Sequence, residues 1–265
     1  MFKSIIYILL PATFLVISCN NNDSKGTESI PATEQTIRNQ IKQYPDSLEL
    51  HNKLVDYFAS NNDYGAALKE TNIVIKKDSS NPTLWDAKAR LLFLNGDTTG
   101  AIDALNRAIE IFPDPQYIIS LGTIYAQTNN PLALAMADAL LNAPRANAAL
   151  QALFIKGLYY SYSGDKAQAV SFFDKCLTTD YTFLDAYREK AIALYEMAKY
   201  EEALKVLETA TTVQKTYEEG WYWMGKCYQK LNKNKEAIES YRMALQFDPE
   251  FIEAKDALGK LGVKG

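Results

Sequence analysis

Histidine and cysteine are scarce: the 265 residues contain one histidine and three cysteines. A lone histidine, His51, cannot build a histidine-based metal cluster or a Ser-His-Asp triad. The sequence also lacks a P-loop, a dinucleotide-binding fingerprint and a CxxC motif. We therefore predict that the protein is not an enzyme and has no cofactor or metal site, and that His51 is structural.

An excess of basic residues is also missing. Lysine and arginine number 28 against 32 aspartates and glutamates, which gives a net charge of −4. Because binding to nucleic acid depends on neutralising phosphates, this balance argues against a nucleic-acid partner. Glycine (12) and proline (9) are low as well. Sheet-rich folds use many glycine and proline turns, so their scarcity favours a helical protein.

The N-terminal apolar run, from Ser4 to Ile17, is shorter than the roughly 20 residues that span a bilayer. It has the proportions of a secretory signal peptide, with the small residue Ser18 at the cleavage point. Val16-Ile17-Ser18-Cys19 resembles the bacterial lipobox. This resemblance implies a signal peptide over residues 1–18 and a lipid on the Cys19 thiol; the alternative is an uncleaved N-terminal anchor helix.

Residues 19–31 are polar and rich in Asn, Ser and Thr, which predicts a flexible tether between the lipid and a folded domain. The residue after Cys19 is Asn20 and not the aspartate that is associated with retention in the inner membrane. The lipoprotein resemblance therefore implies an outer-membrane location. Since the tether has few acidic residues, we expect the domain to face the periplasm.

Small residues recur with a period of about 34 through the rest of the chain, which indicates internal repeats. Three series are in phase: Ala89, Gly122, Gly157, Ala191 and Gly225; Ala101, Ala169, Ala203 and Ala237; Ala108, Cys176, Ala210 and Ala244. Small residues at such positions let neighbouring helices approach closely, while the bulky residues between them fill the core.

This pattern resembles the tetratricopeptide repeat, a helix-turn-helix unit, as in "WYWMGKCYQKLNKNKEAIESYRMALQFDPE" with Trp221, Gly225, Tyr228, Ala237 and Pro249. The resemblance implies an all-α fold in which about six units over residues 32–265 stack into a right-handed superhelical solenoid. The predicted units are 48–81, 82–114, 115–149, 150–183, 184–217 and 218–251, with a capping helix over 252–263. The third unit departs from the motif, so its second helix, at about 131–142, should be shorter.

The remaining cysteines, Cys176 and Cys227, fall in different units at positions that favour small buried residues. The periplasm can oxidise thiols, so a disulfide is an alternative. Their separate positions favour two buried free thiols.

The resemblance also implies a concave groove lined by the first helix of each unit, where a peptide or helix of another protein would bind. Aromatic residues and arginine are the anchors that protein interfaces concentrate. Alternatively, the aromatic residues pack against the next unit. The predicted groove residues are Arg90, Phe93, Phe154, Leu158, Tyr162, Arg188, Ile192, Tyr195, Tyr222 and Lys226.

The sequence thus predicts a lipid-anchored scaffold or adaptor that binds a protein or peptide partner in the bacterial cell envelope. One alternative is a glycan-binding component of an outer-membrane nutrient-uptake system, with Tyr162 and Tyr222 stacking on sugar rings. Another is self-association through the C-terminal helix.

Overall fold

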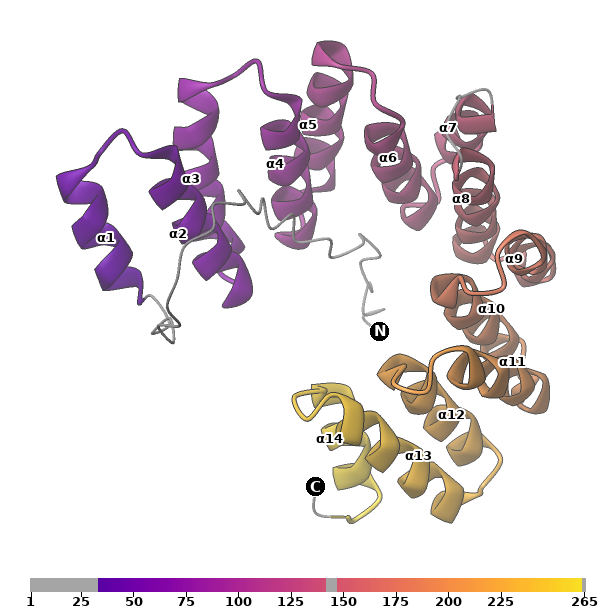
Figure 1. The fold of residues 1–265 in the computed structure, drawn as a ribbon. Helices are drawn as coiled ribbons and strands as arrows, with labels where there is room; N and C mark the ends of the chain where they lie inside the picture. The colour runs from indigo at the N-terminus through magenta and orange to yellow at the C-terminus, as the bar shows by residue number, and fades with distance from the viewer. Residues whose placement is uncertain (1–32, 142–146, 264–265) are drawn as a thin grey trace, which may run out of the picture. The chain divides into compact units, whose positions relative to one another are not determined.

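The computed structural model describes residues 33–141 and 147–263, which fold into fourteen α-helices with no strand in these ranges (Figure 1). The predicted all-α fold class is therefore confirmed. The predicted signal peptide, Cys19 and the whole predicted tether lie outside the described residues. The helices are α1 Glu34–Gln43, α2 Leu48–Ser60, α3 Tyr64–Lys77, α4 Pro82–Leu94, α5 Thr98–Ile111, α6 Pro115–Gln127, α7 Leu132–Leu141, α8 Ala148–Ser163, α9 Lys166–Thr179, α10 Leu184–Glu196, α11 Tyr200–Val213, α12 Glu218–Lys230, α13 Asn234–Phe247 and α14 Ile252–Lys260.

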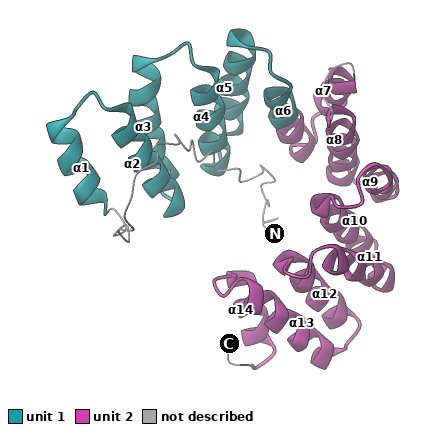
Figure 2. Ribbon diagram, viewed as in Figure 1, with its two compact units in different colours: residues 1–121 teal, residues 122–265 magenta. Residues whose placement is uncertain are grey.

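The chain divides into two compact units, shown in teal and magenta in Figure 2. Unit 1 ends at Leu121 and unit 2 begins at Gly122, so the division falls inside α6. Within unit 1, α2 packs against α3 and α4 against α5. Within unit 2, α8 packs against α9, α10 against α11 and α12 against α13, and each pair also contacts the next. Both units are therefore stacks of helix pairs.

A left-handed residue closes the turn inside each of six helix pairs. These residues are Asn62, Gly96, Asn129, Gly164, Ala198 and Asn232. The repeat motif has glycine at this position because glycine adopts positive φ at no steric cost, and asparagine tolerates it. Ala198, with φ of 59°, keeps the same turn without either advantage. All six turns thus share a left-handed residue, although the type of that residue varies among glycine, asparagine and alanine.

Close packing of the two helices in a pair depends on glycine. A Cβ added to Gly157 would lie 2.5 Å from Cε1 of Phe173, and one added to Gly225 would lie 2.5 Å from Cε1 of Tyr241. Both rings are fully buried. Because real side-chain atoms do not approach so closely, only glycine lets α8 meet α9, and α12 meet α13, at these points.

Two further expectations concern helix α7 and the cysteines. Helix α7 has 10 residues against 14 in α9, within a described range that ends at Leu141. Cys176 and Cys227 are buried and free, and burial raises the pKa of each thiol to about 12. The two buried free thiols are therefore confirmed. None of the described helices is both long and apolar enough to cross a membrane.

Candidate functional site

The candidate site lies on unit 2, on the surface formed by the first helix of each pair. We call this surface, formed by α8, α10, α12 and α14, the first-helix face. Helix α10 contacts both α8 and α12, so the face is continuous there. Four of the predicted groove residues on it are exposed or half-buried and can reach a partner: Tyr162, Ile192, Tyr195 and Lys226.

Lys226 is held among three aromatic rings. Its Nζ lies 5.1 Å from the ring centroid of Trp223, 5.6 Å from that of Tyr195 and 5.8 Å from that of Tyr222. The rings of Tyr195 and Trp223 also contact each other edge to face, with centroids 5.6 Å apart. Rings at these distances attract a cation through their quadrupoles, so the aromatic residues hold Lys226 in place without neutralising its charge.

Two more lysines lie near this cluster. Nζ of Lys230 is 6.0 Å from the Tyr195 ring. The pKa of Lys226 is lowered by its partial burial, and further by the positive charges of Lys230 and Lys260. Within residues 33–141 and 147–263, none of these three lysines has an ion-pair partner. The cluster can therefore donate to a carboxylate or carbonyl group that a partner brings.

Carboxylates are also present at the α14 end of the face. Burial raises the pKa of the Tyr222 hydroxyl, and the charges of Glu253 and Asp256 raise it further. Burial likewise raises the pKa of Tyr195, to about 12. Both hydroxyls thus remain protonated near neutral pH and can donate hydrogen bonds.

Arg188 does not have the environment that we predicted. Its side chain is buried and forms ion pairs with Asp185 (3.1 Å), Glu189 (3.3 Å) and Glu219 of α12. The Tyr217 hydroxyl donates to the Glu219 carboxylate at 3.3 Å. The expectation of an accessible arginine beside the groove is therefore corrected: Arg188 joins α10 to α12 inside the unit.

Burial is the largest single influence on the pKa values of Asp185, Arg188 and Glu189. Burial raises the pKa of Asp185 and of Glu189, and the charge of Arg188 opposes the rise in both cases. Burial lowers the pKa of Arg188, but the surrounding carboxylates raise it by more. A single guanidinium thus pairs with three carboxylates, although its buried Nη2 has no hydrogen-bond partner among the described residues.

Four more predicted groove residues are buried: Phe93, Phe154, Leu158 and Tyr222. The Phe154 ring lies 5.8 Å from Phe173 and 4.9 Å from Phe183 between centroids. Tyr222 similarly lies 5.7 Å from Tyr241 and 5.2 Å from Phe251. The expectation that these side chains face a ligand is corrected, because all four are buried, and Phe154 and Tyr222 pack against the following elements.

In unit 1, the predicted residue Arg90 is half-buried and pairs with Asp86 at 3.3 Å. Burial raises the pKa of Asp86, and Arg90 and Ser120 oppose the rise. His51 is buried, with Nδ1 2.8 Å from the Glu70 carboxylate, as expected for a structural residue. Among the described residues, no group of three His, Cys, Asp or Glu side chains could hold a metal ion.

Sequence reasoning missed Trp223, Lys230 and Glu219. Trp223 falls outside the family's groove positions, although "WYW" at 221–223 already marks an unusual aromatic density. Glu219 follows Arg188 by 31 residues, which is close to one repeat period. That spacing between opposite charges is the signal that could have paired them.

Comparison with known proteins agrees with this repeat architecture. Three models described as tetratricopeptide repeat match residues 52–114, 150–182 and 218–251. The chain is a tetratricopeptide repeat protein. A TPR repeat-containing protein of Methanocaldococcus jannaschii is 25% identical over 89% of this chain. The chain spans only 42% of that relative's length.

Solved structures share the fold of this tetratricopeptide repeat protein at low sequence identity. A tetratricopeptide repeat protein from Parabacteroides merdae has a TM-score of 0.66 and 16% identity, with 85% of this chain and 89% of that chain covered. PilW, described as a type IV pilus biogenesis factor, has a TM-score of 0.58 and 18% identity, with 80% and 98% covered. Likeness at this level of identity concerns the fold.

Proposed function

We propose that this tetratricopeptide repeat protein is a non-enzymatic scaffold that binds a peptide or helix of another protein on the first-helix face of unit 2. The observation that carries the proposal is the environment of Lys226. A half-buried cation among three rings, beside two further lysines, lacks a carboxylate partner in the described part of the chain. Burial and the two neighbouring lysines disfavour the charged form of Lys226, so a carboxylate supplied by a partner would stabilise it.

The partner segment should carry a carboxylate next to an apolar or aromatic side chain. Its carboxylate would accept hydrogen bonds from Lys226 and Lys230, while its apolar group would contact Tyr195 and Ile192. Aromatic and cationic anchors at the centre of an interface account for most of its binding free energy. The glycan alternative is less well supported, because the Tyr222 ring is buried between Tyr241 and Phe251 and offers no free face to a sugar.

We also propose that the protein acts in the bacterial cell envelope, anchored to the outer membrane by lipid on Cys19 and facing the periplasm. The lipobox-like residues 16–19 and the polar residues after them support this location. Replacing Cys19 with alanine should release the protein from the membrane fraction. A Cys19→Ala protein that stays in the membrane fraction with unchanged gel mobility would contradict the anchor.

Photo-crosslinking in the native host tests the binding face. A photoreactive amino acid at Ile192 should crosslink to a partner protein, whereas one at Tyr181, 69% exposed in the turn before α10, should not. Lys226→Glu should abolish the Ile192 crosslink, and Lys233→Glu, in the turn before α13, should leave it intact. Equal crosslinking from both sites, or no response to Lys226→Glu in a folded protein, would refute the proposed face.

A further inference from the structure

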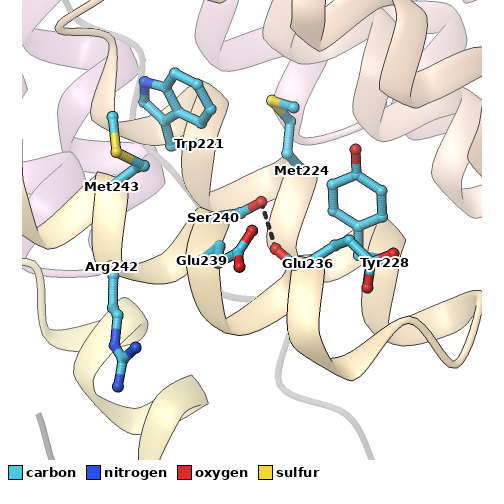
Figure 3. A pocket seen from close by; sticks show the side chains of 8 residues that line it. All are labelled: Trp221, Met224, Tyr228, Glu236, Glu239, Ser240, Arg242 and Met243. Atoms are coloured by element: carbon cyan, nitrogen blue, oxygen red, sulfur yellow. Dashed lines mark hydrogen bonds between the residues drawn. The ribbon is translucent and has the colours of Figure 1, made fainter.

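A pocket of about 510 Å³ lies between α12 and α13 of unit 2 (Figure 3). Its apolar wall is made by Trp221, Met224, Tyr228 and Met243. The other lining side chains are polar or charged: Glu236, Glu239, Ser240 and Arg242. The Ser240 hydroxyl already donates to the Glu236 backbone carbonyl at 2.8 Å, the dashed line in Figure 3. The free polar groups in the pocket are therefore mostly carboxylates.

The two preceding helix pairs have a lysine where this pair has Met224. Lys156 of α8 and Lys190 of α10 occupy the same repeat position as Met224 of α12. Nζ of Lys156 lies 2.7 Å from Asp138 of α7, and Nζ of Lys190 lies 2.5 Å from Asp174 of α9. These lysine side chains are only 22% and 20% exposed. In both pairs, a lysine thus bridges to the second helix of the preceding pair.

In the α12 pair, the carboxylate position of this bridge is kept on α11, although the lysine position is not. Glu208 of α11 occupies the repeat position of Asp174. The described ranges give Glu208 no ion-pair partner. Glu208 is not among the residues that line the pocket, but its charge and that of Glu236 add to the effect of burial in raising the pKa of the lining residue Tyr228. The pocket therefore includes, at Met224, the repeat position where the two preceding pairs have a lysine, while Glu208 lies outside its lining.

We propose that this pocket binds an arginine or lysine side chain of a partner protein, which takes the place of the lysine that Met224 replaces. The aliphatic stem of the incoming side chain would lie along Met224 and Trp221, and its cation would pair with Glu208 and Glu236. Two carboxylates, on Glu236 and Glu239, line the pocket and outnumber the one cation, on Arg242. An arginine suits the site best, because its planar guanidinium also stacks on aromatic rings.

Methyl NMR of the full chain, labelled at methionine and held in detergent micelles, reports on the pocket directly. Met224 and Met243 line it, and Met136 of α7 and Met197 of the α10–α11 turn do not. The probes are short peptides that differ at one central residue: arginine, its uncharged isostere citrulline, or norleucine. We expect the arginine peptide to shift the Met224 and Met243 methyls without affecting the other two, and to bind at least about tenfold more tightly than the citrulline peptide.

Substitutions at Glu208 and Met224 distinguish the contribution of charge to peptide binding from that of the space in the pocket. Glu208→Gln alters an exposed side chain and should weaken binding of the arginine peptide about tenfold, without changing binding of norleucine. Met224→Lys should restore the internal ion pair and abolish the Met243 shift, while Met224→Leu, which preserves volume, should keep it. Melting temperature should not fall in Met224→Lys, because the two preceding pairs already accommodate this lysine.

The inference is overturned if norleucine binds as well as arginine, if Glu208→Gln has no effect, or if neither Met224 nor Met243 shifts at millimolar peptide. Lys226→Glu should leave these shifts unchanged, because Lys226 lies outside the pocket. The pocket and the first-helix face can therefore fail independently.

Discussion

Arg188 and Lys226 are cations on neighbouring first helices of unit 2, and their surroundings are opposite. Arg188 is 5% exposed and contacts three carboxylates. Lys226 is half-buried among three aromatic rings and has no carboxylate partner in the described ranges. Arg188 therefore has a structural role inside the unit, whereas Lys226 is available to bind a carboxylate of a partner.

The difference shows that a residue's place in the repeat does not decide whether it binds. Both residues fall on positions that the family directs into its groove. Their roles are set by what the next helix contributes: Glu219 of α12 reaches back to Arg188, while α14 contributes Lys260, which further disfavours the charge on Lys226. Electrostatic partners one repeat away therefore distinguish a structural cation from an available one.

The sharpest test of this contrast is to remove each cation in turn. Arg188→Met leaves Glu189 buried without its counter-charge, and we expect a loss of about 3–5 kcal/mol in the free energy of unfolding. Lys226→Met removes a cation whose charged form is disfavoured by burial and by Lys230 and Lys260. The loss in the free energy of unfolding should therefore stay below about 1 kcal/mol. Urea unfolding followed by circular dichroism measures both.

Similar losses for the two variants would break the contrast between a structural and an available cation. Arg188→Lys serves as a control for charge without the guanidinium geometry. Since lysine cannot form the same fork of hydrogen bonds, it should recover only part of the stability.

A second test addresses the link between α10 and α12. Glu219→Gln removes the carboxylate that Arg188 and Tyr217 share, and we expect it to cost about 1–2 kcal/mol. Glu218→Gln is the matched control, because its neighbouring carboxylate lies in the same first turn of α12 without contacting Arg188. If the two substitutions cost the same, the link between the helices does not stabilise the unit.

The fold could be predicted because its determinants are local and repeat along the chain. Gly157 and Gly225 lie two periods apart, and each meets an aromatic ring supplied by the following helix. Such a pair is visible in the sequence since both partners belong to the same unit. The left-handed turn residue is less uniform than these glycines: it is glycine at Gly96 and Gly164, but asparagine or Ala198 in the other pairs.

The candidate site could be predicted only in part. Tyr195 and Lys226 were found from their groove positions, but Phe154 and Tyr222 are covered by Phe183 and Phe251. Both covering residues lie just before the first helix of the next pair, outside the unit whose motif was read. Neighbouring units therefore decide exposure, and a motif that describes one unit cannot show it.

The smallest expected effect concerns pH, and it distinguishes the buried carboxylates from exposed ones. Burial raises the pKa of Glu189 above its ordinary 4.5, with Arg188 opposing and Asp185 and Glu219 adding to the rise. The folded state then holds a proton that the unfolded state has lost. Stability from this group is present at low pH and is lost as pH rises through the raised pKa.

In Glu189→Gln this titration is absent, so the stability of the wild type should fall relative to the variant as pH rises from about 4 to 7. Glu49→Gln is the control with the opposite sign, because Lys53 lowers the pKa of the exposed Glu49. That contribution is lost as pH falls. Because the pKa of Glu49 lies below 4.5, unfolding of the three proteins from about pH 3 to 7 measures both signs. The same pH dependence for wild type and Glu189→Gln would show that Arg188 neutralises Glu189 completely.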